Sequence, residues 1–146
     1  MWKVTIWPTG DTMDVGYVIR YWLATAQADL RAAEHLFRAG DYVHVLFLGY
    51  LYLEKTIRAV VVRHTGEHAA RNATLEELAQ IAELDLTLAQ WGFLNRVTEY
   101  YAKTKYPDLS LNFQNQCTRE FCAVEFKQIR DFGIWLAQVA GSPAAP

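Results

Sequence analysis

The sequence predicts a single all-α domain, an up-and-down antiparallel bundle of about five helices preceded by a short extended arm. Two observations support this prediction. Apolar residues recur at helical spacing in segments separated by short turns, and 52% of the 146 residues are hydrophobic, which is enough for one core. We divide the chain into an extended N-terminal arm over 1–14, the bundle over 15–141 and a disordered tail over 142–146.

The N-terminal arm alternates between residue types as a strand does. Residues 2–7 follow this pattern until Pro8 interrupts it. Because a lone strand is not stable by itself, the arm either docks on its own bundle, pairs with a second subunit or frays.

The first two predicted helices form a hairpin. Segment 15–39 has one apolar face, and Gly40 with Asp41 suits the end of one helix and the start of the next. Segment 42–65, ended by Gly66, is apolar on nearly every side. Such a helix must be covered by several others or by a partner chain, and we therefore expect a homodimer.

The later helices are marked by capping residues. Residues 74–77 and 87–90 match capping boxes, which begin a short helix to about 83 and a longer one to 105, and Thr118 caps a helix to about 141. The core stripe of the helix that runs to Lys105 is predicted to be Phe93, Leu94, Val97, Tyr100 and Tyr101. The final helix carries the apolar residues Phe121, Val124, Phe126, Ile129, Phe132, Ile134, Trp135 and Leu136.

Charge and composition exclude several classes of protein. With 14 basic and 16 acidic residues the net charge is −2, so any RNA contact must be local. No apolar run is long enough to span a membrane, which favours a cytoplasmic location. Cys117 and Cys122, five apart at what looks like the start of one helix, are expected to be free thiols. Without a phosphate-binding loop, a Ser-His-Asp set or a zinc cluster, no cofactor is predicted.

Five short motifs occur in order along residues 16–140: Ala-Asp-Leu-Arg-Ala-Ala at 28–33, Gly-Asp-Tyr at 40–42, Leu-Tyr-Leu-Glu-Lys-Thr-Ile-Arg-Ala at 51–59, Leu-Glu-Glu-Leu at 75–78 and Tyr-Pro-Asp at 106–108. Their order and separations resemble the small HEPN proteins of prokaryotes. The resemblance implies a helical bundle, commonly a homodimer, that often works beside a small nucleotidyltransferase, in toxin–antitoxin pairs or related nucleotide-handling systems.

Active members of the HEPN superfamily resemble metal-independent ribonucleases, in which an arginine precedes a histidine by four to six residues late in the bundle. The arginine holds the scissile phosphate while the histidine moves protons. Here Arg96 occupies the corresponding helix, but Val97 follows it where a polar residue is usual, and no histidine occurs after His68. A tyrosine, with a pKa near 10, cannot replace the histidine. We therefore do not expect nuclease activity from Arg96.

A displaced version of the same spacing occurs at Arg63 and His68, in the wrong helix. Together with Arg96 they are weak catalytic candidates, and the alternative is that they are solvated side chains at a helix end. His64 and His68 lie four residues apart beside Glu67, but Gly66 breaks the helix, so no metal site is predicted.

Two polar groups are candidates for ligand binding. Arg96, Tyr100 and Lys103 share one helix face, where tyrosine can stack a base while the cations hold phosphate. The alternative is that Tyr100 packs in the core or a dimer interface and the charges face solvent. Glu54, Lys55 and Arg58 interrupt the apolar segment 42–65, either as an internal ion pair, as a polar patch at a subunit seam or as ligand-binding residues.

The function we expect is that of a dimeric HEPN-like protein that binds a nucleotide or RNA, or a partner nucleotidyltransferase, without ribonuclease activity. One alternative is a metal-independent ribonuclease toxin of a toxin–antitoxin pair. A second alternative is a structural or adaptor helical bundle.

Overall fold

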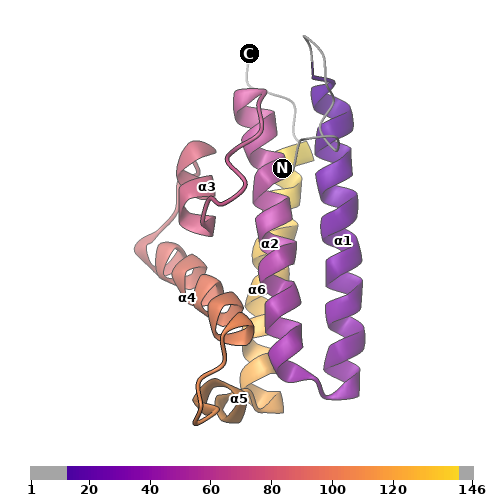
Figure 1. The fold of residues 1–146 in the computed structure, drawn as a ribbon. Coiled ribbons are helices and arrows are strands. Elements are labelled where there is room, and N and C mark those ends of the chain that lie inside the picture. The colour runs from indigo at the N-terminus through magenta and orange to yellow at the C-terminus, as the bar shows by residue number, and fades with distance from the viewer. Residues whose placement is uncertain (1–12, 142–146) are drawn as a thin grey trace, which may run out of the picture.

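The computed structural model describes residues 13–141, and in this part of the chain the fold is an all-α bundle, as predicted (Figure 1). Residues 1–12 of the arm predicted over 1–14 and the tail over 142–146 lie outside the described residues, so the predictions made for the arm and the tail stay predictions. The helices are α1 (Val15–Ala39), α2 (Tyr42–Thr65), α3 (Leu75–Ile81), α4 (Leu88–Lys105), α5 (Asn112–Gln116) and α6 (Arg119–Gly141). The short helix α5 lies in a segment predicted to be a loop.

The turn between α1 and α2 is made by a glycine in the left-handed region. Gly40 has a φ of 85°, and the backbone amides of Gly40 and Asp41 donate to the carbonyls of Phe37 and Leu36. Asp41 occupies the N-cap position of α2, but its side chain makes no capping hydrogen bond. The expected reversal is therefore confirmed, and it depends on Gly40 rather than on a cap by Asp41.

Helix α2 is the central element of the bundle. It packs along α1 and α6 and also contacts α3 and α4 (Figure 1). The approach to α6 is close, because a Cβ at Gly133 would lie 2.1 Å from the ring of Tyr52. The apolarity of α2 is therefore largely accounted for within one chain, and the homodimer inferred from it stays a prediction.

Both predicted capping boxes are present. The hydroxyl of Thr74 accepts from the backbone amide of Glu77, whose carboxylate accepts from the amide of Thr74, and Thr87 and Gln90 repeat the arrangement. The hydroxyl of Thr118 accepts from the Phe121 amide at 3.1 Å. The starts of α3, α4 and α6 thus follow directly from the sequence.

Three of the apolar residues of α6 lie outside its core. Val124 and Ile134 are 58% and 48% exposed, and Trp135 is 37% exposed. Val124 and Ile134 each lie two residues from a buried position, Cys122 and Leu136, and two residues turn a helix through about 200°. In α4 the stripe is confirmed for Phe93, Leu94, Val97 and Tyr100, whereas Tyr101 is half-buried.

The two cysteines are free thiols, as expected, and both are buried, but they do not share a helix. Cys117 caps the end of α5, whereas Cys122 lies in α6. Burial raises the pKa of the Cys117 thiol to about 11 and that of the Cys122 thiol to about 12. Both thiols are therefore protonated at neutral pH and poor nucleophiles.

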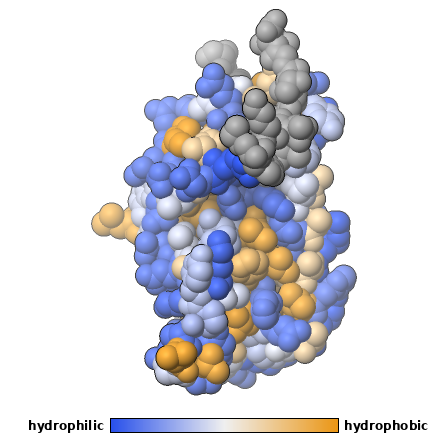
Figure 2. Space-filling view, viewed as in Figure 1, coloured by the Kyte–Doolittle hydropathy of each residue, from blue (hydrophilic) through white to orange (hydrophobic). Residues whose placement is uncertain are grey.

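The described surface carries scattered hydrophobic side chains. Leu109 and Leu111, which precede α5, are exposed, and Figure 2 shows hydrophobic atoms at this lower end of the molecule. Among the helices that the structure describes, none has the length and apolarity needed to cross a bilayer.

Candidate functional site

Arg96 on α4 faces a carboxylate on α6. Its Nε donates to Oε1 of Glu125 at 2.7 Å, and its Nη2 lies 3.5 Å from Oε2. The Glu125 side chain is only 7% exposed, whereas that of Arg96 is 42% exposed. The guanidinium therefore has one edge tied to a buried carboxylate and the rest near the surface.

Two further side chains complete this cluster, which we call the Arg96 cluster: Arg96, Tyr100, Glu125 and Gln128. The Tyr100 hydroxyl donates to Oε1 of Glu125 at 2.6 Å, and the Gln128 amide donates to Oε2 at 3.3 Å. The Gln128 carbonyl in turn accepts from Arg96 at 3.4 Å. The buried carboxylate is thus satisfied from three sides, as a buried charge requires.

The Arg96 cluster combines a charged arginine with a protonated tyrosine. The hydrogen bond to Glu125 is the largest cause of the raised pKa of Arg96, so its charge is permanent. Burial, followed by the hydrogen bond to Glu125, raises the pKa of Tyr100 well above its ordinary value of 10. The phenol stays protonated at neutral pH, which confirms that it cannot act as the missing base.

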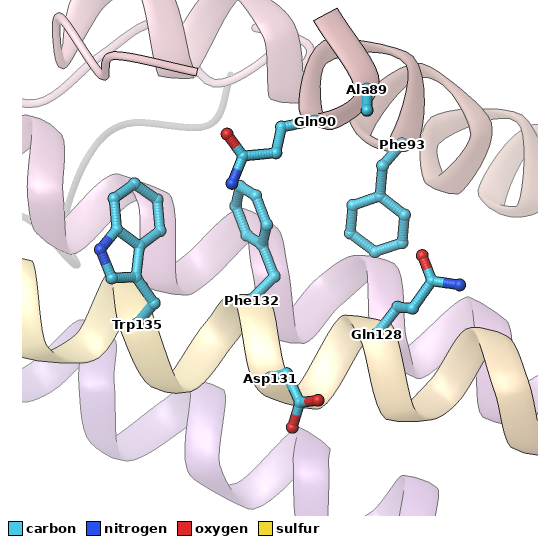
Figure 3. Close-up of a pocket in the computed structure, with 7 residues that line it drawn as sticks. All are labelled: Ala89, Gln90, Phe93, Gln128, Asp131, Phe132 and Trp135. Atoms are coloured by element: carbon cyan, nitrogen blue, oxygen red, sulfur yellow. The ribbon is translucent and has the colours of Figure 1, made fainter. Parts of the chain in front are cut away.

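A hollow of about 380 Å³ lies beside the Arg96 cluster, between α4 and α6. Its lining residues, drawn in Figure 3, are Ala89, Gln90, Phe93, Gln128, Asp131, Phe132 and Trp135. Figure 3 shows the rings of Phe93 and Phe132 between α4 and α6, with the Asp131 carboxylate pointing away from them. Gln128 belongs to both the hollow and the cluster, and the Arg96 guanidinium lies 5.3 Å from the centre of the Phe93 ring.

Glu125 and Gln128 were not predicted from the sequence. They lie 29 and 32 residues after Arg96 in the chain, so no local pattern connects them to it. One signal was available, because Glu125 is flanked by the apolar residues Val124 and Phe126.

Lys103, predicted to share a binding strip with Arg96 and Tyr100, has different neighbours. Its Nζ lies 3.9 Å from Glu99 and 5.8 Å from the centre of the Phe113 ring. The three residues share α4, but only Arg96 and Tyr100 meet at one carboxylate.

The polar group in α2 is engaged within the chain. Buried Arg58 pairs with Glu54 at 3.0 Å and donates to the carbonyls of Ala70 and Arg71 at 3.1 and 2.9 Å. Lys55 pairs with Asp29 of α1 at 2.7 Å. Arg58 therefore clamps the loop after α2 onto the bundle. This arrangement matches the expected internal ion pair, and ligand binding by these residues stays a prediction.

The displaced pair, Arg63 and His68, does not converge on one site. Nε of Arg63 donates to the carbonyl of Ala140 at 2.9 Å, whereas the His68 ring lies 6.4 Å from the ring of Trp22 in an edge-on arrangement. Burial, followed by the charge of Arg58, lowers the pKa of His68. His64 pairs instead with Glu83. No group of side chains suited to a metal occurs among the described residues.

The fold and the Arg96 cluster define an all-α bundle with an arginine held between its fourth and last helices. Comparison with protein families identifies the bundle, because the HEPN domain model matches residues 19–131, well over half of the chain. The chain therefore belongs to the HEPN family. Neither a curated protein nor a solved structure gives a significant match.

Proposed function

We propose that this chain is a HEPN protein that binds RNA or a nucleotide without cleaving it. The observation that supports the proposal is the setting of Arg96. In the helix where related ribonucleases place their arginine and histidine, Arg96 is tied to buried Glu125 and Tyr100, and no histidine follows in the sequence.

Cleavage by a metal-independent ribonuclease needs a group that exchanges protons near neutral pH. The Tyr100 hydroxyl has a raised pKa and keeps its proton, and the Glu125 carboxylate accepts hydrogen bonds from three side chains. The cluster ties the positive charge of Arg96 to Glu125, and no histidine follows it. It therefore supports a protein that does not cleave RNA.

The experiment that tests this function compares cleavage and binding on the same RNA. Purified protein is incubated with labelled single-stranded and hairpin RNAs, and the products are resolved on a denaturing gel. We expect cleavage no faster than with the Arg96→Ala variant, together with measurable binding by fluorescence anisotropy. Cleavage that disappears in the Arg96→Ala variant would identify a ribonuclease and contradict the proposal.

A second property, a homodimer formed through the α4–α6 face, is supported by exposed apolar residues. Leu88 is 91% exposed at the start of α4, and Ile134 and Trp135 are exposed on α6 near the hollow. Figure 2 shows a hydrophobic projection where α3 leads into α4. Apolar groups of this kind are characteristic of interface cores.

The oligomeric state tests the homodimer. Sedimentation velocity is expected to give a dimer for the wild type and a monomer for Leu88→Glu combined with Trp135→Glu. A monomeric wild type would overturn this part of the proposal. The nucleotidyltransferase partner and the toxin–antitoxin setting rest on the family alone, and co-expression with a small nucleotidyltransferase encoded beside the gene, followed by pull-down, tests them.

A further inference from the structure

A second hollow, of about 310 Å³, lies between α1 and α6 and differs in charge from the one beside Arg96. Its lining residues are Glu34, Phe37, Arg38, Ala123, Phe126, Lys127 and Arg130. Three of these seven side chains are cationic and one is acidic. This surface could not be predicted from the sequence, because its residues come from two helices far apart in the chain.

The positive charge of the hollow is incompletely neutralised. Arg130 lies 3.7 Å from Glu34, and Lys127 pairs with Asp131 at 2.7 Å. Arg38 has no carboxylate within salt-bridge distance among the described residues, and neither has Arg119, which lies over the Phe37 ring. A chain with a net charge of −2 thus has a local excess of positive charge here.

Two aromatic rings and two guanidinium groups form a strip at this hollow, made of Phe37, Phe126, Arg119 and Arg130. Phe37 and Phe126 are stacked with their centres 6.2 Å apart. The Arg119 guanidinium lies 5.2 Å from the centre of Phe37, and that of Arg130 lies 5.0 Å from the centre of Phe126. At these distances a cation–π interaction holds each guanidinium against its aromatic ring in the absence of a ligand.

Such a strip matches the chemistry of single-stranded RNA. Arginine pairs with phosphate oxygens in a bidentate manner, and its planar guanidinium also stacks on unpaired bases. An acidic peptide would use the charge of the strip but not its stacking surfaces. The charges of Arg38 and Arg119, which have no carboxylate partner in the described part of the chain, supply the phosphate contacts that dominate affinity for nucleic acids.

We infer that the hollow between α1 and α6, with Arg38, Arg119 and Arg130, is a binding site for the backbone of single-stranded RNA. This inference rests on the proposed function and adds the surface that performs it. It assigns RNA binding to a different face of α6 from the one that holds Arg96.

The test compares two variants with equal changes in charge. The site variant combines Arg38→Glu with Arg119→Glu, and the matched control combines Arg20→Glu with Lys105→Glu, which are exposed residues outside this hollow. Circular dichroism melting checks that both fold like the wild type. Binding of a labelled oligouridine of about twelve nucleotides is measured by anisotropy from about 50 to 200 mM salt.

We expect the site variant to bind about tenfold or more weakly than the wild type, with a shallower salt dependence, and the control to lose less than about threefold. Equal losses in both variants, or no loss in the site variant, would overturn the inference while leaving RNA binding by the protein intact. Absence of wild-type binding to any RNA would instead overturn the proposed function. A polyglutamate peptide that competes as well as oligouridine would show a general anion surface and overturn the assignment to RNA.

Discussion

The arginines of this bundle fall into two settings. Arg58 and Arg96 are tied to carboxylates and carbonyls of their own chain, whereas Arg38 and Arg119 have no carboxylate partner among the described residues. Both Arg58 and Arg96 stand out in the sequence. Arg58 interrupts an apolar helix, and Arg96 lies in the helix where a ribonuclease arginine is expected. The difference teaches that an arginine conspicuous in sequence can have a structural role, and that nearby carboxylates decide which cations can hold phosphate.

The largest expected effect on stability is that of replacing Arg58, the buried arginine of α2. Arg58→Met keeps the apolar stem but leaves Glu54 and the carbonyls of Ala70 and Arg71 without their donor. We expect the free energy of unfolding to fall by about 3 kcal/mol, measured by urea denaturation. Arg63→Met, which removes one bond to Ala140, is the control and should cost about 1 kcal/mol. Equal losses in the two variants would contradict the clamp assigned to Arg58.

The second prediction concerns the carboxylate of the Arg96 cluster. Glu125→Ala removes the acceptor of Tyr100 and the partner of Arg96, and we expect a loss of about 2 kcal/mol on urea denaturation. The loss is smaller than for a fully buried pair, since Arg96 is 42% exposed and can regain water. Glu125→Gln retains an acceptor for Tyr100 and should lose less than Glu125→Ala. Equal losses for the two variants would mean that the charge of Glu125, rather than its hydrogen-bond acceptor, stabilises the fold.

The third prediction uses the pH dependence of stability near Arg58. Burial and the charge of Arg58 lower the pKa of His68 below its ordinary value of 6.5, so the unfolded chain binds a proton more readily than the fold does. Stability is therefore expected to fall as the pH drops from 6.5 toward the lowered pKa. Denaturation of the wild type and His68→Gln across this window should show the wild type losing more. Parallel pH profiles of the two proteins would contradict the lowered pKa.

The smallest effect on stability is expected for Arg119. Arg119→Ala removes a contact with the Phe37 ring and no ion pair with described residues, so the free energy of unfolding should change by less than about 0.5 kcal/mol. A thermal melt checks this expectation. A loss as large as that of Glu125→Ala would show that Arg119 is structural and would remove the contrast between the two settings.

Much of the fold followed from local signals in the sequence. The capping boxes at Thr74 and Thr87 and the left-handed Gly40 could be predicted, because each of these features depends only on residues a few positions away in the chain. The short α5 lacks a side-chain cap and is too short for a periodic pattern, so it was missed. The exposure of Val124 and Ile134 depends on how α6 is rotated against α2, which composition does not show.

The candidate site could be predicted only in part. Arg96 and Tyr100 were found because they lie four residues apart on one helix. Glu125 was missed, because its pairing with them is created when α4 meets α6. The strip around Phe37 and Phe126 was missed for the same reason, since the two rings come from the first and last helices.

The contrast between the arginines is tested most directly by following their side chains during an RNA titration. Arginine Nε–Hε resonances are recorded by NMR as an unstructured oligouridine is added, after assignment by Arg→Lys substitution. We predict that the resonances of Arg38 and Arg119 move with the ligand, whereas those of Arg58 and Arg96 stay close to their free positions. Movement of the Arg96 resonance while those of Arg38 and Arg119 stay still would contradict the account.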